Sequence, residues 1–266
     1  ANGRILREAV FDRVWIQPAA SDAGGALGAA LAAWYADGRE RAVPADTGSG
    51  PSADAMQGAL LGPEFSDAEI EATLRTHGAV FRRLDREALL DFTVDRLAAG
   101  QVVGWFQGRM EYGPRALGNR SILALPNSKR IRDLLNLRLK MRVWYQPFCP
   151  SMLEEDALNY LEQYNGTPNR FMTMGYMVKD DKRDEVEGVI SVDGSCRPQI
   201  IQPNSSRYGT LLQCIKNLTG TGVVLNTSFN IHGEPLVCSP YDALNTLKKT
   251  GNEYLVMGNY LVTLKT

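Results

Sequence analysis

The sequence predicts an α/β protein of the α+β type, built on a mixed sheet. Short apolar runs with branched and aromatic residues alternate with segments of helical periodicity. The apolar fraction is 44%, which is enough for a packed core. The chain closes on YLVMGNYLV, a predicted hairpin that turns at Gly258–Asn259. At 266 residues it has room for one large domain or two ordinary ones.

The first sixty residues predict a short N-terminal unit and a linker. Residues 13–20 predict a short strand and a loop, and residues 21–38 predict a polar turn that leads into an Ala-rich helix. Residues 42–60 are rich in Ala, Gly, Ser and Pro, which is typical of a linker or a flexible surface loop.

Helices and strands then alternate. Ser66 and Glu69 form a capping-box pattern ahead of one helix, and a second helix ends before Gly100. QVVGWFQG predicts a strand, and NSKRIRDLLNLRLKMR predicts a helix with one apolar face. RFMTMGYMV, GVISV and GVVLN predict strands. Ser239 and Pro240 predict the start of the last helix.

Composition excludes several classes of protein. The net charge is −1, so a nucleic-acid partner is not expected. No apolar run reaches the ~18 residues of a membrane helix, and the N-terminus lacks a signal-peptide pattern. The four cysteines are widely spaced, which favours free thiols and a cytoplasmic location. The chain does not begin with Met, so we expect upstream residues to be missing.

A glycine-rich turn carries the clearest functional signal. GRMEYGPRALGNRS, residues 108–121 and here called the arginine turn, holds Arg109, Arg115 and Arg120 among glycines and a proline. Residues 100–142 contain nine Lys or Arg against two acids. Glycines let a backbone approach an anion, and guanidinium groups bind phosphate or carboxylate in bidentate fashion. The alternative is a solvated basic face, which we expect for Lys129, Arg130, Arg132 and Arg138.

Two later stretches carry similar signals. VDGSCRP places Arg197 just after a turn at Asp193–Gly194. VVLNTSFN runs from an apolar strand directly into four polar residues: Asn226, Thr227, Ser228 and Asn230. Polar groups at the end of a buried strand often line ligand crevices. The alternative is a polar turn that caps its own backbone.

Three motifs resemble one family. GWFQGRMEYGPRALGNRSILA, VDGSCRPQ and LNTSFNIHGEPLVCSP are similar to the C-terminal domain of the O-carbamoyltransferases, which include nodulation-factor and antibiotic-tailoring enzymes. The opening segment resembles the end of that family's N-terminal domain, which has an actin/sugar-kinase-like fold. The resemblance implies that residues 1–60 are a remnant of that domain with a linker. It also implies that residues 61–266 form a YrdC-like domain with a twisted mixed sheet.

The resemblance also implies a reaction. A YrdC-like domain of this family binds carbamoyl phosphate and ATP with Mg²⁺, forms carbamoyl adenylate and releases pyrophosphate. The N-terminal domain then transfers the carbamoyl group to a hydroxyl of a small-molecule acceptor. That domain holds iron or another divalent metal, and most of it is implied to be absent here, so it would act in cis or in trans.

Site residues follow from the same resemblance. The implied catalytic residues are Arg115, Lys140, Arg197 and Ser228. The implied substrate or nucleotide contacts are Arg109, Arg120, Arg142, Asn226, Thr227 and Asn230. Asp22 matches an acidic metal ligand of the N-terminal domain, whose two histidine ligands lie upstream. The two histidines present, His77 and His232, are expected to be structural or at the surface.

This chain departs from the family pattern at two positions. Ser191 stands where the family usually has histidine, and Gln146 stands where it usually has arginine. Each change removes a potential anion contact. Two alternatives therefore stay open: a YrdC-class protein that makes threonylcarbamoyl adenylate for tRNA modification, and a non-catalytic nucleotide-binding domain.

Overall fold

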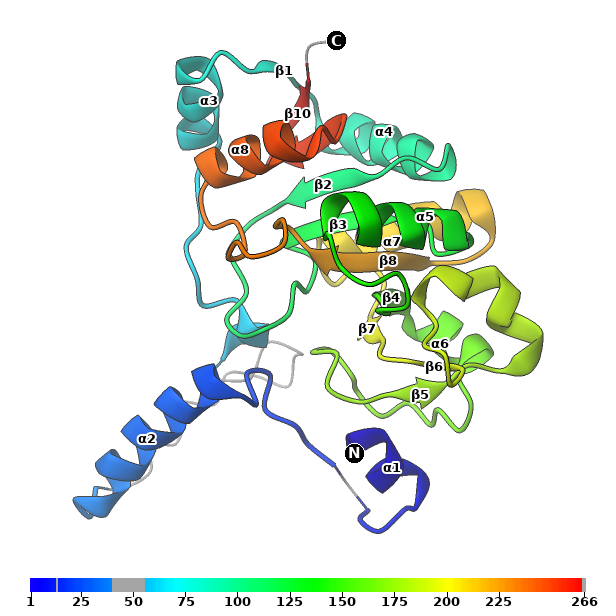
Figure 1. The fold of residues 1–266 in the computed structure, drawn as a ribbon. Coiled ribbons are helices and arrows are strands. Elements are labelled where there is room, and N and C mark those ends of the chain that lie inside the picture. Colours follow the sequence, from blue (N-terminus) through cyan, green and yellow to red (C-terminus); the bar gives the residue numbers. More distant parts are fainter. Residues whose placement is uncertain (13, 40–55, 265–266) are drawn as a thin grey trace.

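A computed structural model describes residues 1–12, 14–39 and 56–264 (Figure 1). Its main sheet has eight strands in the order β1-β10-β9-β2-β3-β8-β4-β7, and β5 and β6 form a separate pair. The β2/β9 and β4/β7 pairs are parallel and the other pairs are antiparallel, which confirms the predicted mixed sheet. The strands are β1 (Val80–Arg83), β2 (Val103–Phe106), β3 (Arg120–Ala124), β4 (Cys149–Leu153), β5 (Tyr176–Met177), β6 (Ser195–Cys196), β7 (Gln199–Ile201), β8 (Val223–Ser228), β9 (Tyr254–Met257) and β10 (Tyr260–Thr263).

Helices cover both faces of this sheet (Figure 1). On one face, α4 and α7 contribute Leu97 and Leu212 to a buried cluster. On the other face, α3, α8 and η2 contribute Leu74, Leu247 and Leu135 to a second, larger cluster. The helices are α1 (Asn2–Arg7), α2 (Asp22–Ala36), η1 (Gln57–Ala59), α3 (Asp67–Thr76), α4 (Arg86–Ala98), α5 (Lys129–Leu134), η2 (Leu135–Leu139), α6 (Glu154–Tyr160), η3 (Asp180–Val189), α7 (Arg207–Thr219) and α8 (Pro240–Thr250).

Local signals placed several helix ends correctly. Ser66 caps α3 in a complete capping box with Glu69, and Ser239 caps α8 with Pro240 as the first helical residue. Gly100 follows the end of α4 with a φ of 75°, as a left-handed residue after a helix should. The predicted helix at residues 21–38 is also confirmed, as α2.

Three strand predictions are wrong or mostly wrong. Residues 170–178 form only the two-residue strand β5, because the side chain of Asn169 occupies the local backbone groups. Its Oδ1 accepts from the amides of Thr173 and Met174, and its Nδ2 donates to the Met174 carbonyl. GVISV forms no strand, since η3 runs through Val189. Residues 14–17 are irregular, and residue 13 lies outside the described residues.

The predicted helix over NSKRIRDLLNLRLKMR changes type halfway. It begins as α5 and continues as the π-helix η2, in which the Lys140 amide donates to the Leu135 carbonyl at 2.8 Å. The extra residue in this turn shifts where the following side chains point. The predicted linker at residues 42–60 lies outside the described residues up to residue 55, and η1 follows it.

The N-terminal segment lies beside the arginine turn. The Tyr112 hydroxyl donates to the Ala23 carbonyl at 2.6 Å, which ties the turn to the start of α2. Beyond this contact α2 extends away from the body of the molecule and has no buried residue (Figure 1). Among the helices described, none combines the length and the apolarity needed to cross a membrane.

Candidate functional site

Four basic side chains gather around the start of β4. They are here called the cation cluster: Arg115, Lys140, Arg142 and Arg197. Arg197, between β6 and β7, donates from Nη2 to the Cys149 Sγ at 3.1 Å. Cys149 affects the pKa of Arg115 and of Arg142, so both side chains lie in its neighbourhood. Lys140 is linked to this group through Arg142, which affects its pKa. That Arg115, Lys140 and Arg197 act in one site stays a prediction.

Arg115 has free donors. Its side chain is half-buried, and no hydrogen bond or ion pair joins it to another residue in the described part of the chain. Burial and the neighbouring Arg197 lower the pKa of Arg115, because both disfavour the charged form. An anionic ligand would stabilise the charged form of a half-buried arginine that has no partner.

Lys140 is held in a cage of oxygens. Its Nζ donates to the Ser228 carbonyl at 2.6 Å and Oγ at 3.2 Å, and to the Asn230 Oδ1 at 2.6 Å and carbonyl at 2.9 Å. The side chain is 5% exposed. Burial, with a smaller effect of Arg142, lowers the pKa of Lys140 to about 7. The π-turn of η2 thus delivers Lys140 to the end of β8, where the predicted Ser228 and Asn230 lie.

Arg142 is held by its neighbours. Its Nε donates to the Asn136 Oδ1 at 2.6 Å, and its guanidinium stacks 4.5 Å from the centre of the Phe148 ring. Burial lowers the pKa of Arg142. Asn136 was not among the predicted site residues, although its place one turn before Lys140 was visible in the sequence.

Arg120 and Arg109 do not join the cluster. Arg120 is fully buried, stacks 3.6 Å from the centre of the Phe106 ring, and donates only to carbonyls, including that of Gln107 at 2.9 Å. This contradicts its expected role as a ligand contact, because its donors are already used. Arg109 is exposed and pairs with Glu64 at 3.5 Å beside the linker.

The polar residues at the end of β8 have two different roles. Asn226 is 2% exposed, and its Nδ2 donates to the Ala116 carbonyl at 3.2 Å and to the Ser151 Oγ at 3.0 Å. It therefore supports the arginine turn from inside the protein, which differs from the expected ligand contact. Thr227 points to the opposite face of the sheet, since successive side chains of a strand alternate. Ser228 follows and contacts Lys140.

The remaining predictions fall at the surface. Asp22 is exposed at the start of α2, and nowhere in the described residues do three His, Cys, Asp or Glu side chains gather as metal ligands. The Asp22 assignment stays a prediction. His77 stacks on Tyr241, with ring centres 4.6 Å apart, and His232 is exposed.

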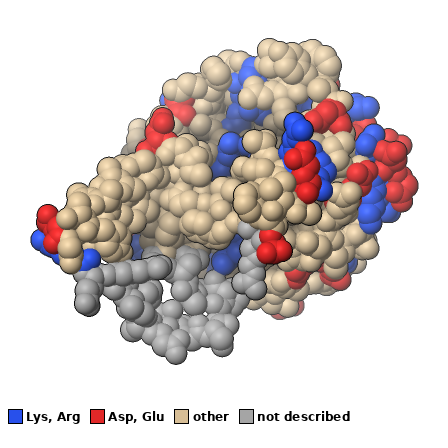
Figure 2. All heavy atoms as spheres, turned by 90° about the horizontal axis from the view of Figure 1, so that it is seen from below, with Lys and Arg blue, Asp and Glu red and all other residues tan. Residues whose placement is uncertain are grey.

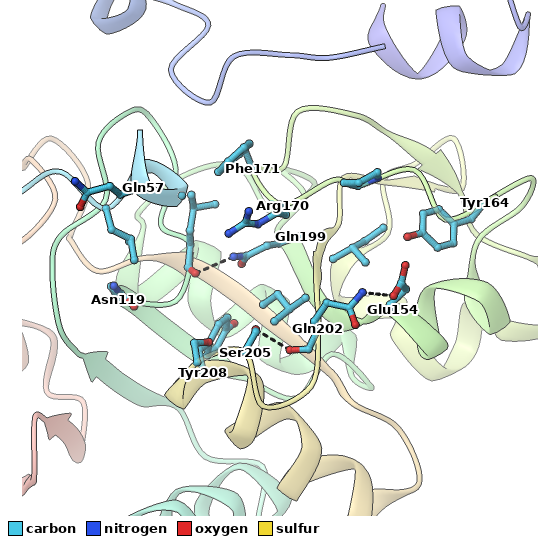
Figure 3. Close-up of a pocket in the computed structure, with 17 residues that line it drawn as sticks. Gln57, Asn119, Glu154, Tyr164, Arg170, Phe171, Gln199, Gln202, Ser205 and Tyr208 are labelled. Atoms are coloured by element: carbon cyan, nitrogen blue, oxygen red, sulfur yellow. Dashed lines mark hydrogen bonds between the residues drawn. The ribbon is translucent and has the colours of Figure 1, made fainter. Parts of the chain in front are cut away.

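A cavity of about 890 Å³ is lined in part by Leu117 and Asn119 of the arginine turn. The hydrogen bond from the Gln199 Nε2 to the Leu117 carbonyl, 2.8 Å long, joins two of its lining residues. Tyr164 lies at one end, and Gln57 and Asn119 lie at the other (Figure 3). No member of the cation cluster lines it. No sequence motif predicts this cavity, because its walls come from segments far apart in the chain.

The sequence resembles known proteins over most of its length. Residues 94–264 match the family model described as the carbamoyltransferase C-terminus, and residues 1–31 match the carbamoyltransferase N-terminus. Nodulation protein NolO of Bradyrhizobium diazoefficiens is 40% identical over 98% of this chain and 46% of its own length. Nodulation protein NolNO of Sinorhizobium fredii is 37% identical over 100% of this chain and 38% of its own length.

The chain thus spans less than half the length of these curated relatives. Among solved structures, full-length HypF in a phosphate- and nucleotide-bound form matches with a TM-score of 0.47 at 18% identity. That match covers 64% of this chain and 25% of HypF.

Proposed function

The chain belongs to the carbamoyltransferase family, and on that premise we propose that it carries the adenylate-forming site of a carbamoyltransferase. In this proposal it binds carbamoyl phosphate and ATP with Mg²⁺, forms carbamoyl adenylate and releases pyrophosphate. The observation that supports it most is the cation cluster. None of its four members forms an ion pair with an acid in the described part of the chain.

The charge pattern suits this chemistry. Water first cleaves carbamoyl phosphate into carbamate and inorganic phosphate. A carbamate oxygen then bonds to the α-phosphorus of ATP, and the bond from that phosphorus to pyrophosphate breaks. Negative charge develops on phosphate oxygens in that step. Cations held in place beforehand stabilise it without reorganising, and they act most strongly where water is scarce. Lys140 and Arg142 are held in this way by hydrogen bonds and ring contacts.

Roles can be proposed for individual residues. Arg115, with its free donors, binds the phosphate of carbamoyl phosphate, and Arg197 acts beside it. Ser228 contacts the nucleotide phosphates. Lys140, whose donors already face Ser228 and Asn230, acts on these phosphates through its positive charge. Mg²⁺ would be held by the ATP phosphates themselves, since the described residues contain no group of three or more His, Cys, Asp or Glu side chains that could hold a metal ion.

Arg115→Ala tests the proposed reaction. We expect it to abolish carbamoyl-phosphate-dependent ATP/pyrophosphate exchange, because the loss of one such cation raises the barrier by about 2.7–4 kcal/mol. Exchange of labelled pyrophosphate into ATP measures this, and circular dichroism verifies the fold. Arg138→Ala is the matched control, since Arg138 is an exposed cation of the same basic stretch. Near-normal exchange by Arg115→Ala would reject the site.

The acceptor step belongs to a larger assembly. We propose that a carbamoyltransferase N-terminal domain, in cis or in trans, packs on α2 and carries out transfer to a small-molecule hydroxyl. Support comes from the family match at residues 1–31 and from the exposed surface of α2, which is mostly uncharged except at its far end (Figure 2). Asp22 would join iron or another divalent metal there. The protein would act in the cytoplasm, without nucleic acid.

A second candidate is a nucleotide-binding domain without catalysis. Gln146 is exposed and Ser191 is half-buried, and neither supplies the cationic or imidazole group usual in the family. Calorimetry that shows ATP binding without pyrophosphate release would favour it. Exchange that depends on bicarbonate and threonine would instead favour the threonylcarbamoyl adenylate reaction of tRNA modification.

A further inference from the structure

Glu111 is a buried acid inside the arginine turn. It is 3% exposed, and its Oε1 accepts from the backbone amides of Leu117 at 2.7 Å, Asn119 at 2.7 Å and Arg120 at 3.2 Å. Its Oε2 is shielded from solvent and has no hydrogen-bond partner among the described residues. One carboxylate oxygen therefore gathers three amides that belong to the segment just after Arg115.

The carbonyls of the same segment accept hydrogen bonds from side chains of other strands. The Ala116 carbonyl accepts from the Asn226 Nδ2 at 3.2 Å, and the Leu117 carbonyl accepts from the Gln199 Nε2 at 2.8 Å. The Gly118 carbonyl accepts from the Trp105 indole at 2.9 Å. Buried side chains thus fix successive peptide groups on both sides, and these donors come from β8, β7 and β2.

Arg115 directly precedes the backbone segment that these contacts hold. The four side chains that hold it are here called the clamp: Glu111, Asn226, Gln199 and Trp105. The guanidinium of Arg115 has no partner in the described residues, so its position depends on the backbone beneath it. A cation that stabilises a transition state must be placed to within a fraction of an ångström, and a shift of 1 Å can cost about 100-fold. The clamp supplies that placement, and Glu111 makes the largest number of its bonds.

We propose that Glu111 is a positioning residue for Arg115. Its carboxylate closes the arginine turn and holds Arg115 toward Cys149 and Arg197. The proposal rests on the proposed function in one respect, which is that Arg115 binds the phosphate of the carbamoyl donor. Glu111 does not contact the ligand itself, because both of its oxygens are buried within the turn.

Glu111→Gln is the first test. The amide keeps the shape and one acceptor but removes the charge that holds three amides together. We expect the KM for carbamoyl phosphate in the exchange assay to rise about 10- to 100-fold, as when a residue that orients a ligand-binding group is lost. The KM for ATP should change less than about twofold, since Lys140 and Ser228 lie outside the clamp. Glu87→Gln, at an exposed position of α4, is the control and should leave both values unchanged.

A double-mutant cycle is the second test. Calorimetry measures the affinity for phosphonoacetamide, a stable analogue of carbamoyl phosphate, in both single variants and in the double variant of Glu111→Gln and Arg115→Ala. If Glu111 acts through Arg115, its replacement costs affinity in the wild type and nothing further in Arg115→Ala. Equal losses in both backgrounds would overturn the proposal. Glu111→Asp, which keeps the charge but is one methylene shorter, replaces Glu111→Gln if that variant does not fold.

The two tests separate this inference from the proposed reaction. A wild type without exchange would reject the reaction, and the calorimetric cycle would still decide the role of Glu111. Normal exchange together with additive losses would reject the role of Glu111 alone.

Discussion

Among the single residues of the site, Lys140 is distinguished by a low side-chain pKa. Its pKa of about 7 lies well below the ordinary lysine value because of burial, assisted by Arg142. In the unfolded chain Lys140 has its ordinary, higher pKa, so it keeps its proton at pH values at which Lys140 of the folded protein has lost it. This residue therefore makes the folded state more stable as pH rises from about 7 toward the ordinary lysine pKa.

The same pKa predicts proton uptake on ligand binding. A bound phosphate favours the ammonium form, so we expect ATP to bind with uptake of a proton near pH 8 and with little uptake near pH 6. Affinity should fall as pH rises above about 7. Calorimetry in buffers of different ionisation enthalpy measures the uptake. Lys140→Gln is the control, and uptake of the same size in that variant would contradict the assignment.

Elements decide where these residues point. The apolar periodicity of residues 131–139 predicted a helix correctly, but it could not reveal the π-turn that carries Lys140 to Ser228, which is 88 residues away in the chain. Likewise, the glycines of the arginine turn indicated a special backbone without saying why. Gly118 has a φ of 104°, and a Cβ there would overlap the ring of Tyr208 on α7. The reason for that glycine lies in another element.

Gly118→Ala should therefore destabilise the fold strongly. The left-handed backbone costs about 1–2 kcal/mol for a residue with a Cβ, and the overlap with Tyr208 adds about 1–3 kcal/mol. Urea unfolding measures the sum. Gly220→Ala is the matched control, because Gly220 also has a positive φ, 85°, but a Cβ there meets no atom within 4 Å. Equal losses in the two variants would show that Tyr208 moves aside.

The whole molecule consists of a packed sheet domain, on which Leu6, Val14 and Ile16 of the N-terminal segment also pack, and the helix α2, which has no buried residue. Leu31 and Trp34 on α2 are each 45% exposed, although α2 is one of the longest helices. A helix with apolar residues on its surface and no buried residue gains little stability from packing on its own domain. The proposed N-terminal domain would supply the missing contact surface.

Replacing these apolar residues tests this division. We expect Leu31→Ser with Trp34→Ser to change the free energy of unfolding of this chain by no more than about 0.5 kcal/mol, as for exposed positions in general. Urea unfolding measures it. Leu212→Ala, at a fully buried position of α7, should cost about 2–5 kcal/mol as the control. A loss above about 1 kcal/mol in the α2 variant would mean that α2 packs on the body.

The sequence by itself determined the mixed α/β class, the caps of α3 and α8, and the closing hairpin, and it predicted Arg115, Lys140, Arg197 and Ser228 as site residues. Those features depend on neighbours in the chain or on motifs, so they can be read locally. Only the tertiary structure decided that Arg120 and Asn226 face inward, that Asn169 replaces a predicted strand, and that Glu111 closes the arginine turn. Each of these depends on which distant groups meet a buried polar atom, and a polar atom removed from water binds whichever partner the fold brings to it.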